Sequence, residues 1–205
     1  KSVQDAARIA ARISGDSTVA YGFAFALAAE TALGWKVPQR AQLLRGIMAE
    51  LERLSHHVND IGAICNDASV VAIHARCVLL RERILQTAKS CFGHRFRMDC
   101  IVPGGVAVDL APGSHAAIES MLSALAEDFE RIMYVYDEAP SLQDRTVTTG
   151  TISADLVRRF AAGGYVGRAA GRAFDTRVNY PYAPYDEVSF EMAVREEGDV
   201  DARLQ

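Results

Sequence analysis

The residues most able to do chemistry lie on one predicted helix, PQRAQLLRGIMAELERLSHHVNDIGAICND, which covers residues 38–67. Glu50, Arg53 and His57 follow one another at steps of three and four residues, so they share one strip of the helix surface. A carboxylate, a guanidinium and an imidazole that titrates near neutral pH suit proton transfer or binding of a polar partner. An exposed ion pair beside a solvated histidine has the same spacing and is common. Both interpretations stay open, and His56, about 100° away, is expected to face solvent.

An apolar stripe on the same helix predicts that a neighbouring face packs into a core. Its members are Leu44, Ile47, Met48, Leu51, Leu54, Val58, Ile61 and Cys65. The same period predicts further helices over about residues 16–33, 69–92 and 114–136. Three to four long helices joined by short links are typical of a helical bundle, so the sequence predicts a mainly α fold with a helical core over about 16–137.

The rest of the chain, about 138–205, is irregular in pattern. A short helix is predicted over 154–162, and Val188–Val194 alternates like a strand. Pro103-Gly104-Gly105 predicts a turn between two of the long helices. We therefore expect residues 1–205 to form a single domain, with a loop-rich C-terminal part and a short β segment.

Composition excludes several classes of function. A net charge of -4 over 205 residues gives no broad attraction to nucleic acid. No apolar run reaches the roughly 20 residues that span a bilayer, and the N-terminus has no signal-peptide pattern, which favours the cytoplasm. The four cysteines form no C-x-x-C pair and are expected to be buried, reduced thiols; they are Cys65, Cys77, Cys91 and Cys100.

The order of motifs along the chain resembles one family, from about residue 12 to the last residue. It is the large subunit shared by group 4 membrane-bound nickel–iron hydrogenases of the formate hydrogenlyase type and the 49 kDa proteins of respiratory complex I, the NADH-quinone oxidoreductase. The matching motifs are Glu50-x-x-Arg53-x-x-x-His57, Asp67, Arg81-Glu82, Gly93-His94-Arg95, Gly104-Gly105-Val106, Asp109, Arg145-Thr146, Arg168, Asp175-Thr176-Arg177, Tyr180-Pro181-Tyr182, Tyr185 and Gly198-Asp199-Val200.

The resemblance implies a subunit of an NADH-quinone oxidoreductase or a hydrogenase-related complex. Its expected partners are a small iron–sulfur subunit that holds the cluster, a 30 kDa-type companion and the membrane subunits of an ion-translocating complex. These partners would hold the chain on the cytoplasmic side of the inner membrane. The implied site is a proton or quinone cavity lined by Glu50, Arg53, His57 and Asp67, with Tyr21 and Asp67 facing a quinone.

One segment departs from the hydrogenase pattern. Hydrogenases of this group have R-x-C-G-x-C where this chain reads Arg12-Ile13-Ser14-Gly15-Asp16-Ser17. Nickel and iron are held by soft thiolates, and a neutral hydroxyl does not replace them, so we expect no metal at Ser14 and Ser17. The other cysteine pair of the hydrogenases is expected beyond Gln205. The tyrosine that contacts quinone in complex I relatives falls on Gly15, and its histidine partner comes from an N-terminal β region outside this sequence.

Two further groups of charged residues have alternative interpretations. Arg168, Asp175 and Arg177 suit an anion clamp, but mutual pairing that braces a loop is favoured because unpaired buried charge is costly. Arg81 and Glu82 either line the region next to the iron–sulfur subunit or hold helices in register. For the whole chain, the alternative to a redox subunit is a non-catalytic scaffold, a divergent or truncated large subunit; in either case we expect no activity from the chain alone.

Overall fold

The computed structural model describes residues 2–205 and is mainly α-helical, as predicted. The residues form two compact units. The first runs to Gly62 and resumes from Ala75 to Phe129, and the second comprises Ala63–His74 and Glu130–Gln205. The prediction of a single domain over 1–205 stays a prediction.

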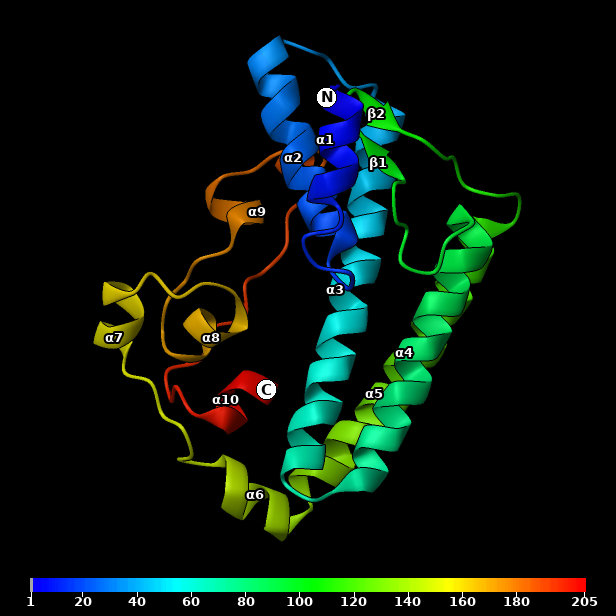
Figure 1. Ribbon diagram of the computed structural model, residues 1–205. Coiled ribbons are helices and arrows are strands. Elements are labelled where there is room, and N and C mark those ends of the chain that lie inside the picture. The colour runs from blue at the N-terminus through cyan, green and yellow to red at the C-terminus, as the bar shows by residue number, and fades with distance from the viewer. Residues whose placement is uncertain (1) are drawn as a thin grey trace. The chain divides into compact units, whose positions relative to one another are not determined.

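The first unit contains most of the long helices (Figure 1). In it, α1 lies against α2, and α2 contacts β1. The elements that lie in this unit, wholly or in large part, are α1 (Val3–Ala10), α2 (Thr18–Leu33), α3 (Gln39–Asp67), α4 (Val71–Phe92), β1 (Ile101–Val102), β2 (Gly105–Val106) and α5 (Ser114–Asp137).

Local sequence signals set the ends of the first two helices. At α1, Ser2 accepts a hydrogen bond from the Asp5 amide while the Asp5 carboxylate accepts one from the Ser2 amide, which is a capping box. At the C-terminal end of α2, Gly34 takes the left-handed conformation, with φ 67°, which favours glycine at this position.

A buried ion pair holds the β1–β2 hairpin against the helices. Arg45 of α3 and Glu30 of α2 are 2.6 Å apart with 1% and 6% of their side-chain surfaces exposed. Glu30 accepts a hydrogen bond from the Gly104 amide at 2.7 Å, and Arg45 donates to the Val102 carbonyl oxygen at 2.7 Å. The hairpin is therefore fixed by charged groups that hydrogen-bond its backbone, in addition to its own antiparallel pairing.

The second unit is built from short helices around a buried tyrosine. Tyr136 is fully buried, and its hydroxyl donates to Asp201 at 2.7 Å and lies 2.8 Å from the Thr146 hydroxyl. Its further elements are α6 (Pro140–Thr146), α7 (Ala154–Arg159), α8 (Gly164–Ala169), α9 (Thr176–Asn179), the 3-10 helix η1 (Tyr185–Glu187) and α10 (Val200–Leu204).

The structure corrects one element and confirms others. The predicted strand over Val188–Val194 is wrong: this segment has no regular structure, and among residues 2–205 no strand pairs with it. Alternation alone does not make a strand, because a strand needs a neighbour for its backbone hydrogen bonds. The short β segment is instead the hairpin at the predicted Pro103-Gly104 turn. All four cysteines are buried as expected. Within the described chain no helix is long and apolar enough to span a membrane.

Candidate functional site

The strip that first suggested chemistry lies on α3. Glu50 and Arg53 form an ion pair of 3.2 Å, and each side chain is 38% exposed. His57, one turn further on, is half-buried and also has an interaction partner. A pair with this exposure contributes little to stability. A role of these three residues in proton transfer stays a prediction.

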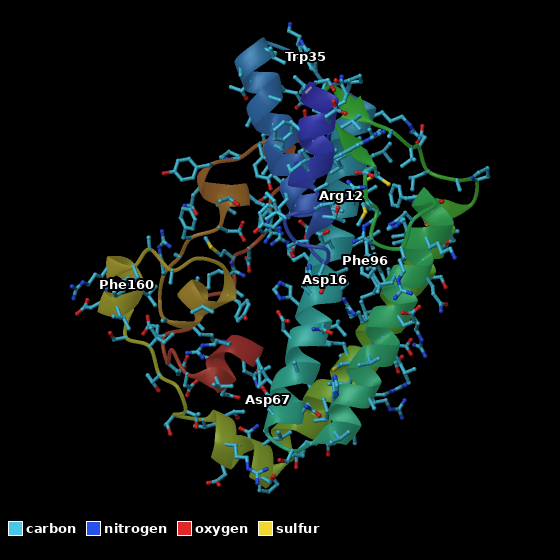
Figure 2. The ribbon with its side chains drawn as sticks, viewed as in Figure 1. Arg12, Asp16, Trp35, Asp67, Phe96 and Phe160 are labelled. Carbon is cyan, nitrogen blue, oxygen red and sulfur yellow. The ribbon has the colours of Figure 1, made fainter. Side chains whose placement is uncertain are left out.

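A second polar cluster surrounds the loop between α1 and α2, where the two serines lie. The Nε2 atom of His56 lies 3.1 Å from the Asp16 carbonyl oxygen and 3.5 Å from the Ser17 hydroxyl. The expectation that His56 faces solvent is therefore wrong, because the loop passes over this side of α3 and half-buries the ring. Ser14 is half-buried in the same loop. Figure 2 shows Asp16 beside α3.

The buried carboxylate of Glu52 fixes the start of α2. Ser17 is the N-cap residue, yet its side chain makes no capping hydrogen bond. Glu52 of α3, 3% exposed, accepts hydrogen bonds from the amides of Val19 and Ala20 at 2.8 and 2.9 Å instead. These are the amides that an N-cap side chain normally binds. Burial raises the pKa of Glu52, while the two amides and the guanidinium of Arg97 act in the opposite direction.

Partly exposed ion pairs link the loop to the segment after α4 and to α4 itself. Arg12 makes a bidentate contact with Asp99, both distances being 2.7 Å, and this hydrogen bonding lowers the pKa of Asp99. Arg81 of α4 lies 3.7 Å from Asp16. His56 contacts the backbone of the loop at the Asp16 carbonyl oxygen, the ion pairs hold Arg12 and Asp16 through their side chains, and Glu52 binds the amides of Val19 and Ala20 that follow.

A second ion pair lies near the end of α4. Glu82 pairs with Arg95 at 2.7 Å. Arg97, which is 1% exposed, donates to the Arg95 carbonyl oxygen at 3.0 Å, and burial lowers the pKa of Arg97. The two candidate residues Arg81 and Glu82 thus pair with different segments of the first unit, one with the serine loop and the other with the chain after α4.

The donor set of the loop does not fit a nickel–iron centre. It offers the hydroxyls of Ser14 and Ser17, which are neutral and hard, where such a centre needs thiolates. The four cysteines are buried elsewhere in the helices and near β1, and burial raises the thiol pKa of Cys65 to about 11. Among residues 2–205, no three His, Cys, Asp or Glu side chains form a group that could hold a metal ion.

The residues expected to face a quinone are both exposed. Tyr21 on α2 is 41% exposed and belongs to the first unit. Asp67 is exposed at the end of α3 and belongs to the second unit (Figure 2). A quinone head group bound by either side chain would lie at the surface of that unit. Quinone binding by Tyr21 and Asp67 stays a prediction.

Asp175 of the second unit pairs with two arginines. Asp175, the N-cap of α9, lies 2.7 Å from Arg177 and 3.4 Å from Arg168, and its side chain is 6% exposed. The hydrogen bond from Arg177 is the main reason that the pKa of Asp175 falls to about 2. Asp175 thus links the segments around α8 and α9, and the choice between bracing and an anion clamp stays a prediction.

Comparison with known proteins agrees with this fold and with the motif order. Residues 52–205 match the family model described as the 49 kDa subunit of respiratory-chain NADH dehydrogenase. The chain is 32% identical to the carbon monoxide-induced hydrogenase of Rhodospirillum rubrum over 87% of this chain and 50% of the relative. It is 31% identical to the C/D protein of NADH-quinone oxidoreductase from Phocaeicola vulgatus over 88% of this chain and 35% of the relative.

A solved structure has the same fold. It is that of the membrane-bound sulfane sulfur reductase, an archaeal respiratory membrane complex, in which one chain matches with a TM-score of 0.91 and 25% identity. The match covers 98% of this chain and 54% of the solved one. The chain thus spans about half the length, or less, of the relatives it matches. The extent of the family match shows that the chain belongs to the 49 kDa subunit family of respiratory-chain NADH dehydrogenase, which is related to the large subunits of hydrogenases.

Proposed function

We propose that the chain forms part of the large subunit in a respiratory membrane complex related to complex I and to formate hydrogenlyase-type hydrogenases, and that it works without a nickel–iron centre. The family match over residues 52–205 carries the first part of this proposal. The hydroxyls of Ser14 and Ser17, in a loop that the polar cluster holds in place, support the second.

The partners follow from the family. An iron–sulfur small subunit supplies the cluster, and membrane subunits anchor the complex, with this chain on the cytoplasmic side of the inner membrane. A 30 kDa-type companion is supported by the Phocaeicola vulgatus relative, whose name joins C and D in one protein. The solved relative belongs to a complex described as membrane-bound and respiratory.

Within this complex, we assign the polar cluster around residues 12–17 the role of presenting the loop to the partner or to a quinone. Charged side chains reach the loop surface, with Asp16 64%, Arg12 47% and Arg81 24% exposed. Glu50, Arg53, His57 and Asp67 carry protons or line the quinone cavity in this proposal.

The test is co-production of the chain with its iron–sulfur small subunit, followed by metal analysis and a quinone-dependent electron-transfer assay. We expect a stable complex, no stoichiometric nickel, and electron transfer that Arg81→Gln lowers without preventing assembly. Arg83→Gln is the matched control, because Arg83 lies on the same helix and pairs with Asp128 instead. Stoichiometric nickel would refute the assignment of Ser14 and Ser17.

The same experiment separates the second candidate function. The absence of thiolates in the serine loop also suits a scaffold that binds the iron–sulfur subunit and catalyses nothing. A scaffold would give a stable complex that does not reduce quinone, whether it contains wild-type Arg81 or Arg81→Gln. Failure of the two subunits to associate under any condition contradicts both functions.

A further inference from the structure

The outer face of α2 carries no charge. Glu30 is the only charged residue of Thr18–Leu33, and it is buried against Arg45. The exposed positions of the helix are all uncharged: Ala20, Tyr21, Ala24, Ala28, Thr31, Ala32 and Leu33. A helix that is apolar on every side is normally buried on every side. In this chain, one side of it is open.

Another helix of the same unit shows what a solvated face looks like. The exposed positions of α5 within the first unit include His115, Glu119 and Glu127. Charged side chains interrupt the apolar residues there, as is usual at a surface in contact with water. The composition of the α2 face is therefore that of a contact surface.

The shape of the face suits another helix. Ala20, Ala24, Ala28 and Ala32 recur every four residues, and a row of small side chains in this direction leaves a groove between larger neighbours. Tyr21 and Leu33, 41% and 49% exposed, flank the row. Trp35, 43% exposed, extends the apolar surface past the C-terminal end of α2, at the opposite end from Asp16 (Figure 2).

We propose that this face of α2 is an internal surface of the assembled large subunit, covered by an uncharged helical segment from the complementary half of that subunit. The solved relative has the same fold over 98% of this chain, yet this chain covers only 54% of the relative. Relatives thus contain nearly as much polypeptide again as residues 1–205. An uncharged groove selects an uncharged partner, because a buried unpaired charge is costly.

Cysteine labelling tests the proposal directly. The four native cysteines are buried, so they give little background with maleimide. Ala28→Cys reports on the α2 face, and Ser123→Cys on the exposed surface of α5 is the control. The samples are the chain alone and the chain produced with the polypeptide that its genome encodes for the rest of the large subunit, as a continuation or as a separate reading frame. We expect Ala28→Cys to react at least tenfold more slowly in the second sample, with Ser123→Cys unchanged.

Several results would overturn the proposal. Equal labelling of Ala28→Cys in both samples is one, and a genome that encodes no complementary polypeptide is another. Protection of Ala28→Cys in the chain alone is a third. The mass of the chain in solution would then identify what covers the face: a doubled mass indicates a second copy, and a monomer mass indicates another segment of residues 1–205.

A charge variant gives an independent readout. Ala24→Glu places a carboxylate in the proposed contact and should abolish assembly of the two halves. Ala124→Glu makes the same change on the exposed surface of α5 and should assemble normally. Far-UV circular dichroism checks that both variants fold. Normal assembly of folded Ala24→Glu would contradict the contact.

Discussion

Glu52 should stabilise the start of α2 more than the serine at its N-cap does. A capping serine replaced by alanine typically costs about 1 kcal/mol. In this chain the Ser17 hydroxyl makes no capping bond, and the Glu52 carboxylate binds the Val19 and Ala20 amides. The expected order of the two substitutions is thus the reverse of the usual one: Glu52→Gln is costly, and Ser17→Ala changes stability by less than about 0.5 kcal/mol.

The size of the Glu52→Gln effect follows from its two hydrogen bonds. A glutamine NH2 group cannot accept a hydrogen bond, so one of the two buried α2 amides is left without its acceptor, at a cost of about 1–3 kcal/mol. The glutamine side chain keeps one oxygen for two donors, but it also removes the cost of burying a charge. We expect a net loss of about 1–2 kcal/mol, which corresponds to a roughly 5- to 30-fold larger equilibrium constant for local opening.

Native-state hydrogen exchange at Val19 and Ala20 measures this opening locally, which matters because two compact units need not unfold in a single step. Burial raises the pKa of Glu52 above its unfolded value, so the stability of the wild type should fall as pH rises from about 4.3 through the folded pKa. Glu52→Gln should lack this slope. Faster exchange at Val19 in Ser17→Ala than in Glu52→Gln would refute the reasoning.

Three further predictions test other parts of the fold. Gly104→Ala should destabilise the hairpin by about 1–2 kcal/mol in chemical denaturation, because φ is +92° there, whereas Gly105→Ala should cost less. Arg45→Met should cost about 3–5 kcal/mol by the same measurement, because Glu30 is left buried and unpaired. The pKa of Asp175 is about 2 in the folded chain and about 3.9 in the unfolded chain. The ionised Asp175 therefore stabilises the fold above this range, and that contribution is lost as pH falls through it. Asp175→Asn should flatten the acid limb of a pH–stability curve.

The long helices were predictable because their apolar period is sustained over many turns. The predicted ranges 69–92 and 114–136 differ from α4 and α5 by no more than two residues at either end. The short helices of the second unit were mostly missed. Helices of three to seven residues contain too few turns for a period, and caps such as Asp175 and Asp199 are recognisable only once the backbone around them is known.

The candidate site was harder to predict than the fold, because its polar residues occupy core positions. Arg45, Glu52 and Ser55 are buried on α3, whereas Ile47 and Leu54, assigned to the core by type, are only half-buried. Spacing alone places Arg45 and Glu52 among the buried residues. The burial of Arg45 and Glu52 was not predicted because both are charged. The partners that make their burial tolerable, Glu30 and the α2 amides, come from another helix.

The contacts around the serine loop depend little on the side chains of residues 14 and 17. His56 binds the Asp16 carbonyl oxygen, Glu52 binds amides of α2, and Arg12 binds Asp99. The Ser17 hydroxyl lies 3.5 Å from His56, which is long for a hydrogen bond. Because the loop is positioned through its backbone and through Arg12, we expect substitutions at residues 14 and 17 to cost the fold little. Family membership, shown by residues 52–205, therefore constrains the architecture of this chain more tightly than the chemistry of the loop, which lies outside that match.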